Sequence, residues 1–304
     1  MDALAGKRVL VTGANGFIGS NVVKTLQHYG ADVHSLNIQE WNLAAITREV
    51  TDICPDYVLH LRGQIGKTDQ TPESFFQINY HDTKILVEAL QVWGKLQQFV
   101  HVGTIAEYGS GQAPFQEDAM SGEPVADYGK SKLAATLWLK DKAQKEQFPV
   151  VIVRLSVVYG PGQKPHTYLI PNVIMSALQK KDFHFATPAL QTRDPLFVSD
   201  AAEGIVAALR TPEAQGEIIN LGLGVEYPVK TIAEMITTML GNPITIQTGN
   251  QPDRSGESLH YWQSITKAGK ILQWQPTHTL EAGLQKTITW YKENFNSNLY
   301  GSTK

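Results

Sequence analysis

Tyr128 and Lys132 are the residues whose types and spacing most directly suggest chemistry in this chain of 304 residues. They lie four positions apart in a helical pattern, so both side chains project from one helix face. An ammonium group near a phenol stabilises the tyrosinate and lowers the phenol's pKa from about 10, which suits a general acid and base. The same spacing also occurs by chance on exposed helix faces, so the rest of the sequence must decide.

Thr104 supplies a second group of the right kind. It follows a β-rich run at residues 99–103 and stands four positions before the pair Tyr108-Gly109. Ligands bind at the carboxyl ends of strands in open α/β sheets, so a hydroxyl there can bond a substrate carbonyl or alcohol while Tyr128 exchanges a proton. The alternative for Thr104 is a strand-end hydroxyl bonded only to backbone.

A glycine turn near the N-terminus predicts a dinucleotide site. A strand at residues 8–12 runs into three glycines at intervals of three, and a helical segment follows up to Gly30. The first glycine permits a tight turn, the second lets the backbone approach a pyrophosphate, and the third allows close helix packing at an N-terminus that favours anions. The predicted contacts are Gly13, Asn15, Gly16, Phe17, Ile18 and Gly19.

The elements that must position these groups alternate between short apolar strands and longer amphipathic helices. This alternation predicts an α/β fold, a Rossmann-type doubly wound parallel sheet with a smaller C-terminal α/β lobe for the substrate. We expect a dinucleotide-binding domain at residues 1–160, to which residues 190–222 return, and a mainly substrate-binding lobe at 161–304. The predicted strands are residues 8–12, 32–36, 57–61, 99–103, 150–155, 217–221 and 244–247. Residues 36–42 are too few for a crossover helix, which predicts an abbreviated sheet there.

Composition excludes several classes of function. The formal charge is −3 without a basic run, which argues against nucleic acid and anionic membranes as partners. A start that runs directly into a strand, with no long apolar stretch later, predicts a cytoplasmic protein without a membrane span. Cys54 is the single cysteine, so an intrachain disulfide and zinc sites built from several cysteines are excluded, and we predict no metal.

Taken together, these motifs resemble the extended short-chain dehydrogenase/reductases of the NAD-dependent epimerase/dehydratase type. The resemblance rests on Thr12-Gly-Ala-Asn-Gly-Phe-Ile-Gly19, on Thr104 before Tyr-Gly and on Tyr128-x-x-x-Lys132, and later segments extend it over nearly the whole chain. It implies that Thr104, Tyr128 and Lys132 are catalytic. It also implies that Lys132 bonds the nicotinamide ribose.

The family pattern further implies cofactor contacts along the sheet edge. The acidic residue that usually binds the adenosine ribose corresponds to Asn37, which neither repels a 2′-phosphate nor attracts one. NAD is the expected cofactor, and NADP is not excluded. Arg62 either reaches a phosphate or is a surface side chain over apolar neighbours. The remaining implied contacts are Asn42 and Leu43 beside the adenine, Leu61, and Asn79.

Two arginines imply the substrate class. Arg193 and Arg254 resemble the pair that contacts the diphosphate in relatives acting on nucleotide sugars, a role suited to planar guanidinium donors. A surface salt bridge is the alternative for each. Tyr168 corresponds to a substrate-facing histidine of GDP-fucose synthetase, which the chain partly resembles.

Departures from the family pattern narrow the expected reaction. Sugar 4,6-dehydratases carry a carboxylate one or two residues after the catalytic threonine, where this chain has Ile105 and Ala106. Hydride transfer at C4 of a nucleotide sugar is therefore expected, by a 4-keto-sugar reductase or a 4-epimerase. The alternatives are a dehydrogenase for a non-nucleotide small molecule and a non-catalytic dinucleotide sensor. A homodimer through helices near residues 72–93 and 125–145 is a family-level expectation.

Overall fold

The computed structural model describes residues 4–36, 38, 40–65, 71–119, 122–165, 168–252 and 258–295. Asn37 and Arg254, both predicted site residues, lie outside the described residues. Among those described, no helix is long and apolar enough to cross a membrane.

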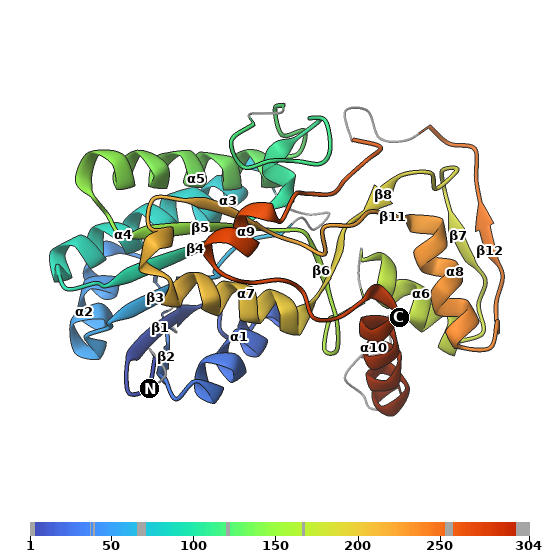
Figure 1. Ribbon diagram of the computed structural model, residues 1–304, viewed down its shortest axis with the longest axis horizontal. Helices are drawn as coiled ribbons and strands as arrows, with labels where there is room; N and C mark the ends of the chain where they lie inside the picture. Colours follow the sequence, from blue (N-terminus) through green and yellow to red (C-terminus); the bar gives the residue numbers. More distant parts are fainter. Residues whose placement is uncertain are drawn as a thin grey trace.

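A six-stranded parallel sheet forms the centre of the larger lobe (Figure 1). Its spatial order is β10-β5-β4-β3-β1-β2, with the chain reversing direction across the sheet after β2, as in doubly wound folds. The strands are β1 (Arg8–Thr12), β2 (Asp32–Ser35), β3 (Tyr57–His60), β4 (Gln98–Thr104), β5 (Val150–Leu155) and β10 (Ile218–Leu221). The predicted fold class is confirmed.

Helices cover both faces of this sheet because its strands are apolar on both sides. One face packs on α1 (Phe17–His28) and α7 (Val198–Arg210), and the other on α2 (Leu43–Ile53), α4 (Asp82–Trp93) and α5 (Asp127–Glu146). Two short helices, α3 (Pro72–Phe76) and the π-helix η1 (Gln77–His81), lead directly into α4. The 3₁₀ turns are η2 (Ile105–Tyr108) and η3 (Pro212–Ala214).

The predicted abbreviation of the sheet at residues 36–42 is wrong. These residues lead into α2, and α2 itself makes the crossover between β2 and β3. Asn42 explains where the helix begins, because its side chain accepts a hydrogen bond from the Ala45 N–H at 2.9 Å and so caps the first turn.

The second lobe is built from helices and very short sheets, to the right in Figure 1. A separate apolar core joins α6 (Leu169–Leu178), α8 (Val229–Met239) and α10 (Leu280–Asn294). Three two-stranded sheets accompany it: β6 (Val157–Tyr159) with β9 (Pro195–Phe197), β7 (Phe183–Phe185) with β12 (Ile246–Thr248), and β8 (Thr192–Arg193) with β11 (Tyr227–Pro228). The helix α9 (Thr266–Ile271) packs back on β10. The domain limits at residue 160 stay a prediction, but β10 and α7 lie with the large sheet.

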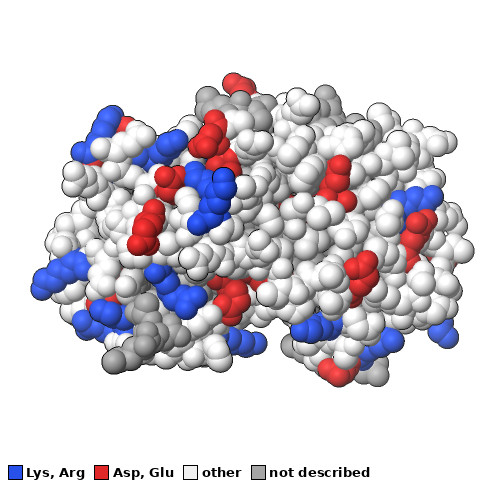
Figure 2. All heavy atoms as spheres, in the orientation of Figure 1, with Lys and Arg blue, Asp and Glu red and all other residues white. Residues whose placement is uncertain are grey.

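Charged side chains are spread over the surface, with Lys and Arg beside Asp and Glu on the face drawn in Figure 2. Along α5, ion pairs at i,i+4 join Lys142 to Glu146 at 2.6 Å and Lys145 to Asp141 at 2.8 Å. Exposed pairs of this kind contribute little to stability, so the fold depends on its apolar layers.

Candidate active site

A cavity of about 710 Å³ lies along the carboxyl edge of the large sheet. The glycine turn lines one part of it, and Thr104, Tyr128 and Lys132 line another. Tyr168 from the second lobe also lines it. The structure therefore brings together the predicted cofactor turn and the predicted catalytic residues.

Gly13 and Gly19 in the glycine turn lie too close to neighbouring backbone for a side chain at either position. Gly13 has φ +73°, and a Cβ on it would lie 2.9 Å from the backbone of Leu61 and Arg62. A Cβ on Gly19 would lie 2.1 Å from the Gly13 carbonyl oxygen, so α1 packs directly on the turn. Gly16 stands just before α1 and brings no side chain between the helix N-terminus and the cavity. The cradle fits a dinucleotide pyrophosphate.

Thr104 is the last residue of β4 and the N-cap of the following 3₁₀ turn, η2. Its Oγ1 accepts the Ala106 N–H at 3.3 Å, and its side chain also hydrogen-bonds that of Tyr128. Sequence reasoning set a backbone-bonded hydroxyl against a catalytic one. The structure shows the backbone contact and the contact with Tyr128 together.

Tyr128 does not have the lowered pKa that its spacing from Lys132 predicts. Burial raises the pKa of the phenol to about 12, and the Thr104 hydrogen bond opposes this only in part. The prediction is wrong because burial destabilises the tyrosinate by more than the Thr104 hydrogen bond stabilises it.

Lys132 is buried on the same helix, one turn after Tyr128. Its Nζ donates to the Val102 carbonyl at 2.5 Å and lies 3.5 Å from His101 Nε2. Burial lowers the pKa of Lys132 to about 8, while Glu107 opposes that shift. The amine is therefore mostly an ammonium at neutral pH.

A buried ion pair holds the backbone of Thr104, and sequence reasoning missed it. Glu107 Oε2 lies 2.8 Å from Arg154 Nε, and Glu107 Oε1 accepts the Thr104 N–H at 2.9 Å. Arg154 also lies over the Tyr108 ring at 4.4 Å. Glu107 lies in the 3₁₀ turn η2, and its carboxylate is engaged by Arg154.

Two of the other predicted cofactor contacts, Asn79 and Arg62, have partners within the chain. Asn79 is buried and bonds the Gln64 backbone and the Ser131 hydroxyl. Arg62 pairs with Asp82 at 2.9 Å and stacks on the Trp41 ring at 4.2 Å. Leu61 lines the cavity, whereas Leu43 is 42% exposed at the start of α2. Cofactor contacts by these side chains, and by Asn42, stay predictions.

Arg193 stands beside the cavity rather than in its wall. Its guanidinium lies 5.2 Å over the ring of Tyr261, which does line the cavity, and Nη1 donates to the Thr192 carbonyl at 2.7 Å. Tyr261 was not predicted, since no motif surrounds it. Other wall residues without a predicted role include Ser20, Gly63, Ile65, Ser156, Gln163 and Lys164.

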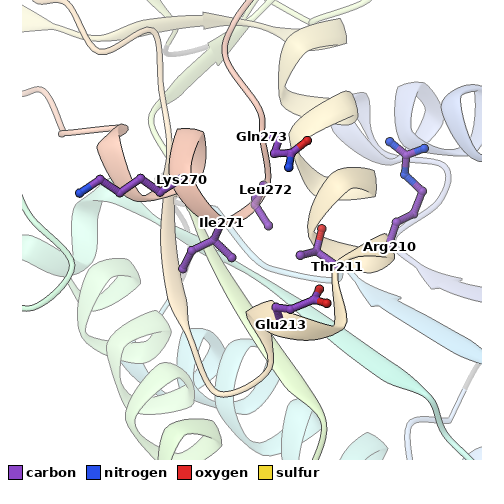
Figure 3. A pocket seen from close by; sticks show the side chains of 7 residues that line it. All are labelled: Arg210, Thr211, Glu213, Lys270, Ile271, Leu272 and Gln273. Carbon is purple, nitrogen blue, oxygen red and sulfur yellow. The ribbon is translucent and has the colours of Figure 1, made fainter.

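A second hollow, of about 570 Å³, lies where α7 and α9 end (Figure 3). Seven residues line it: Arg210, Thr211, Glu213, Lys270, Ile271, Leu272 and Gln273. None of the predicted catalytic or glycine-turn residues is among them. The ends of helices present carbonyl oxygens, which do not favour an anion, so the sheet-edge cavity is the better candidate for chemistry.

Comparison with known proteins decides the family. The model of the NAD dependent epimerase/dehydratase family matches residues 9–222. The chain belongs to this family. A dTDP-D-glucose 4,6-dehydratase from Mus musculus is 29% identical over 96% of this chain and 90% of its own length. A UDP-glucuronate 4-epimerase from Thermodesulfobacterium geofontis is 26% identical over 94% of this chain and 96% of its own.

Solved structures of the family superpose closely. A UDP-glucuronic acid 4-epimerase from Bacillus cereus, in complex with UDP-glucuronic acid and NAD, has a TM-score of 0.83 at 28% identity, covering 94% of this chain and 99% of its own. The NAD dependent epimerase/dehydratase family also explains the glycine cradle, and the predicted cofactor, NAD, is confirmed. Its members include both dehydratases and epimerases, so the comparisons do not support the prediction against dehydration.

Proposed function

We propose that this protein transfers a hydride at C4 of a nucleotide sugar, as a 4-epimerase or a 4-keto-sugar reductase. One observation carries the proposal: the cavity that begins at the glycine turn ends at Thr104, Tyr128 and Lys132, with no carboxylate at positions 105 and 106. Those three side chains suffice to exchange a proton with a sugar hydroxyl.

The nucleotide-sugar class is supported by relatives and by charge. The Bacillus cereus 4-epimerase, which has a similar fold, was solved in complex with UDP-glucuronic acid. Arg193 beside the cavity suits a diphosphate, and Arg254 is predicted to act with it. An apolar ketone substrate offers these guanidinium groups no anion, which argues against a dehydrogenase for such molecules.

The proposed roles follow from the contacts of each side chain. Tyr128, which its raised pKa keeps protonated at rest, donates its proton to the C4 oxygen when a 4-keto group is reduced; when a C4 hydroxyl is oxidised, the tyrosinate form takes the proton. Lys132, mostly charged at neutral pH, stabilises the tyrosinate as it forms. Thr104 bonds Tyr128 and orients the reacting oxygen. When bound, NAD supplies the acceptor and donor of the hydride.

The case against dehydration rests on where the acids lie. Elimination of water from C5 and C6 needs a carboxylate or carboxylic acid near those carbons, and Ile105 is buried and apolar while Ala106 has no acid. Glu107 is buried and bound to Arg154 and to the Thr104 backbone. Dehydration, the activity named for the mouse relative, is the second candidate.

We also propose a homodimer through α3, α4 and α5. Two exposed apolar side chains lie on these helices, Val92 at 71% and Leu137 at 48% exposure, where a second copy would cover them. Sedimentation equilibrium should give twice the chain mass for the parent. Leu137→Lys should shift the protein towards monomer, and an unchanged dimer would place the interface elsewhere.

The test of the proposed function is product analysis with purified protein. UDP-, dTDP-, GDP- and CDP-linked hexoses with a 4-hydroxyl or a 4-keto group are incubated with NAD or NADH. NMR then assigns the configuration at C4, because epimerisation leaves no net change in NADH absorbance. A C4 epimer or a C4 alcohol supports the proposal, and a 4-keto-6-deoxy sugar as sole product overturns it. Mass spectrometry of the denatured protein distinguishes a 4-epimerase from a 4-keto-sugar reductase, since retained NAD is expected of an epimerase.

A further inference from the structure

Two histidines lie side by side beneath the catalytic lysine. His60 on β3 and His101 on β4 are register partners in the large sheet, with ring centroids 5.5 Å apart. Neither side chain is exposed. Their neighbours along the strands are mostly apolar, including Leu59, Val100 and Val102. Two imidazoles at core positions call for an explanation other than packing.

The two rings are bonded differently. Both nitrogens of His60 are used, with Nδ1 2.7 Å from Thr12 Oγ1 and Nε2 2.9 Å from Thr83 Oγ1. His101 presents Nε2 to Lys132 Nζ at 3.5 Å, and its Nδ1 has no hydrogen-bond partner within the described part of the chain. A buried polar atom left unbonded costs stability, so packing alone would favour an apolar residue at position 101.

We propose that His101 is a positioning residue for Lys132, whose ammonium donates a hydrogen bond to the unprotonated His101 Nε2. This proposal rests on the proposed function, in which Lys132 acts on Tyr128 and holds the cofactor. The Val102 carbonyl accepts a second Lys132 N–H from the next residue of the same strand. Without His101, the Val102 carbonyl is the one acceptor left to Lys132 in the described part of the chain.

Only a neutral imidazole can act in this way. Burial, and next the charge of Lys132, hold the pKa of His101 well below its ordinary range. The charged or titratable groups around the lysine are Glu107, which stabilises the ammonium, His60, Tyr128, and Arg62, which acts on His60. A neutral His101 accepts at Nε2 in the tautomer that carries its proton on Nδ1.

Three substitutions at one position test the proposal. Gln carries an amide oxygen near the place of Nε2, Asn carries one near the place of Nδ1, and Leu fills the space without an acceptor. His101→Gln should keep kcat within about threefold of the parent. His101→Asn and His101→Leu should lower kcat by roughly 10- to 100-fold, as expected for loss of a hydrogen bond to a charged group. The KM for the sugar should change little in all three.

The pH profile supplies a readout that a packing defect would not move. Loss of an acceptor destabilises the ammonium, so the pKa of Lys132 falls and the alkaline limb of kcat, which needs the charged form, moves to lower pH. His101→Asn and His101→Leu should show this shift, and His101→Gln should not. His60→Gln is the matched control, buried equally but without a hydrogen bond to Lys132; it should lose stability while the alkaline limb stays in place.

Calorimetry with NAD keeps the two proposals separable. Lys132 is expected to bond the nicotinamide ribose, so His101→Leu should weaken NAD binding about tenfold even if no sugar is turned over. Failure of the proposed function would show as an inactive parent protein, with this arm still readable. Equal kcat and NAD affinity in the parent, Leu, Asn and Gln proteins, or an equal fall in Asn and Gln, would overturn the role of His101.

Discussion

The two ends of the cavity are held in different ways. Around Thr104 and Lys132, buried partners fix the polar groups, and the Glu107–Arg154 pair joins the turn η2 to β5. On the second lobe, Arg193 lies on a two-residue strand, and the neighbouring contacts of Glu226 and His260 are partly exposed. The difference indicates that the large sheet fixes its polar groups through buried partners, whereas the polar groups of the second lobe are less constrained.

The largest effect is expected from Tyr128→Phe, which removes one hydroxyl from the end of the cavity formed by Thr104, Tyr128 and Lys132. General acid and base catalysis contributes about 10²- to 10⁴-fold, so kcat should fall by that order while NAD and nucleotide-sugar binding survive. Tyr29→Phe is a matched control, because its hydroxyl bonds Glu203 away from the cavity. A Tyr128→Phe protein as fast as the parent would remove the phenol from the mechanism.

Glu107→Gln should produce the largest loss of stability among the changes near Thr104. Gln keeps an acceptor for the Thr104 N–H but leaves the buried Arg154 guanidinium without its carboxylate, which costs about 3–5 kcal/mol in the free energy of unfolding. Urea unfolding measures it. Glu146→Gln, which breaks an exposed pair with Lys142, should barely move the midpoint. Equal midpoints for the two variants would mean that Arg154 finds another partner.

Arg193→Ala probes the side of the cavity next to the second lobe, and it should affect substrate binding rather than turnover. If its guanidinium reaches the diphosphate, loss of a charge-assisted hydrogen bond should weaken nucleoside diphosphate binding by about 1.5–3 kcal/mol, with NAD affinity unchanged. Arg210→Ala, beside the second hollow, is the control and should bind as the parent does. Parent-like affinity of Arg193→Ala for UDP, GDP, CDP and dTDP would count against a diphosphate contact.

Asn42→Ala should have the smallest effect. The side chain caps α2, and replacement of an N-cap Asn by Ala costs about 1 kcal/mol of stability. Asn42→Asp keeps an acceptor and should retain that stability, so NAD calorimetry on the Asp protein isolates the predicted adenine contact. Identical unfolding curves for the Ala and parent proteins would show that the cap contributes nothing measurable.

The elements at the sheet edge of the cavity could be predicted because their signals are local. The strand at residues 8–12, the glycine turn and the spacing of Tyr128 and Lys132 each follow from short-range periodicity and backbone geometry. The Glu107–Arg154 pair and the contact of His101 with Lys132 join residues 47 and 31 positions apart. No local pattern reports which strands become neighbours, so these partners were not predicted.

The pKa of Tyr128 shows a second limit. Spacing placed a cation near the phenol, but the sign of the shift depends on how much water the fold removes. Arg62 shows a third, because its stacking on Trp41 and its pairing with Asp82 depend on the packing of the segments around α2 and α4. The two-residue strands β8 and β11 carry too few residues for a periodic signal, whereas the predicted strand at residues 244–247 overlaps β12.

Solvent labelling tests the central claim, hydride transfer at C4 without dehydration, most directly. The protein is incubated in D₂O with NAD and the 4-hydroxy nucleotide sugars, and products are examined by proton NMR. The account predicts a C4 epimer, or oxidation at C4 with formation of NADH, in which the C6 oxygen is retained and C5 carries no solvent deuterium. A 4-keto-6-deoxy product with deuterium at C5 would contradict it, because that elimination needs an acid and base that positions 105 and 106 do not supply.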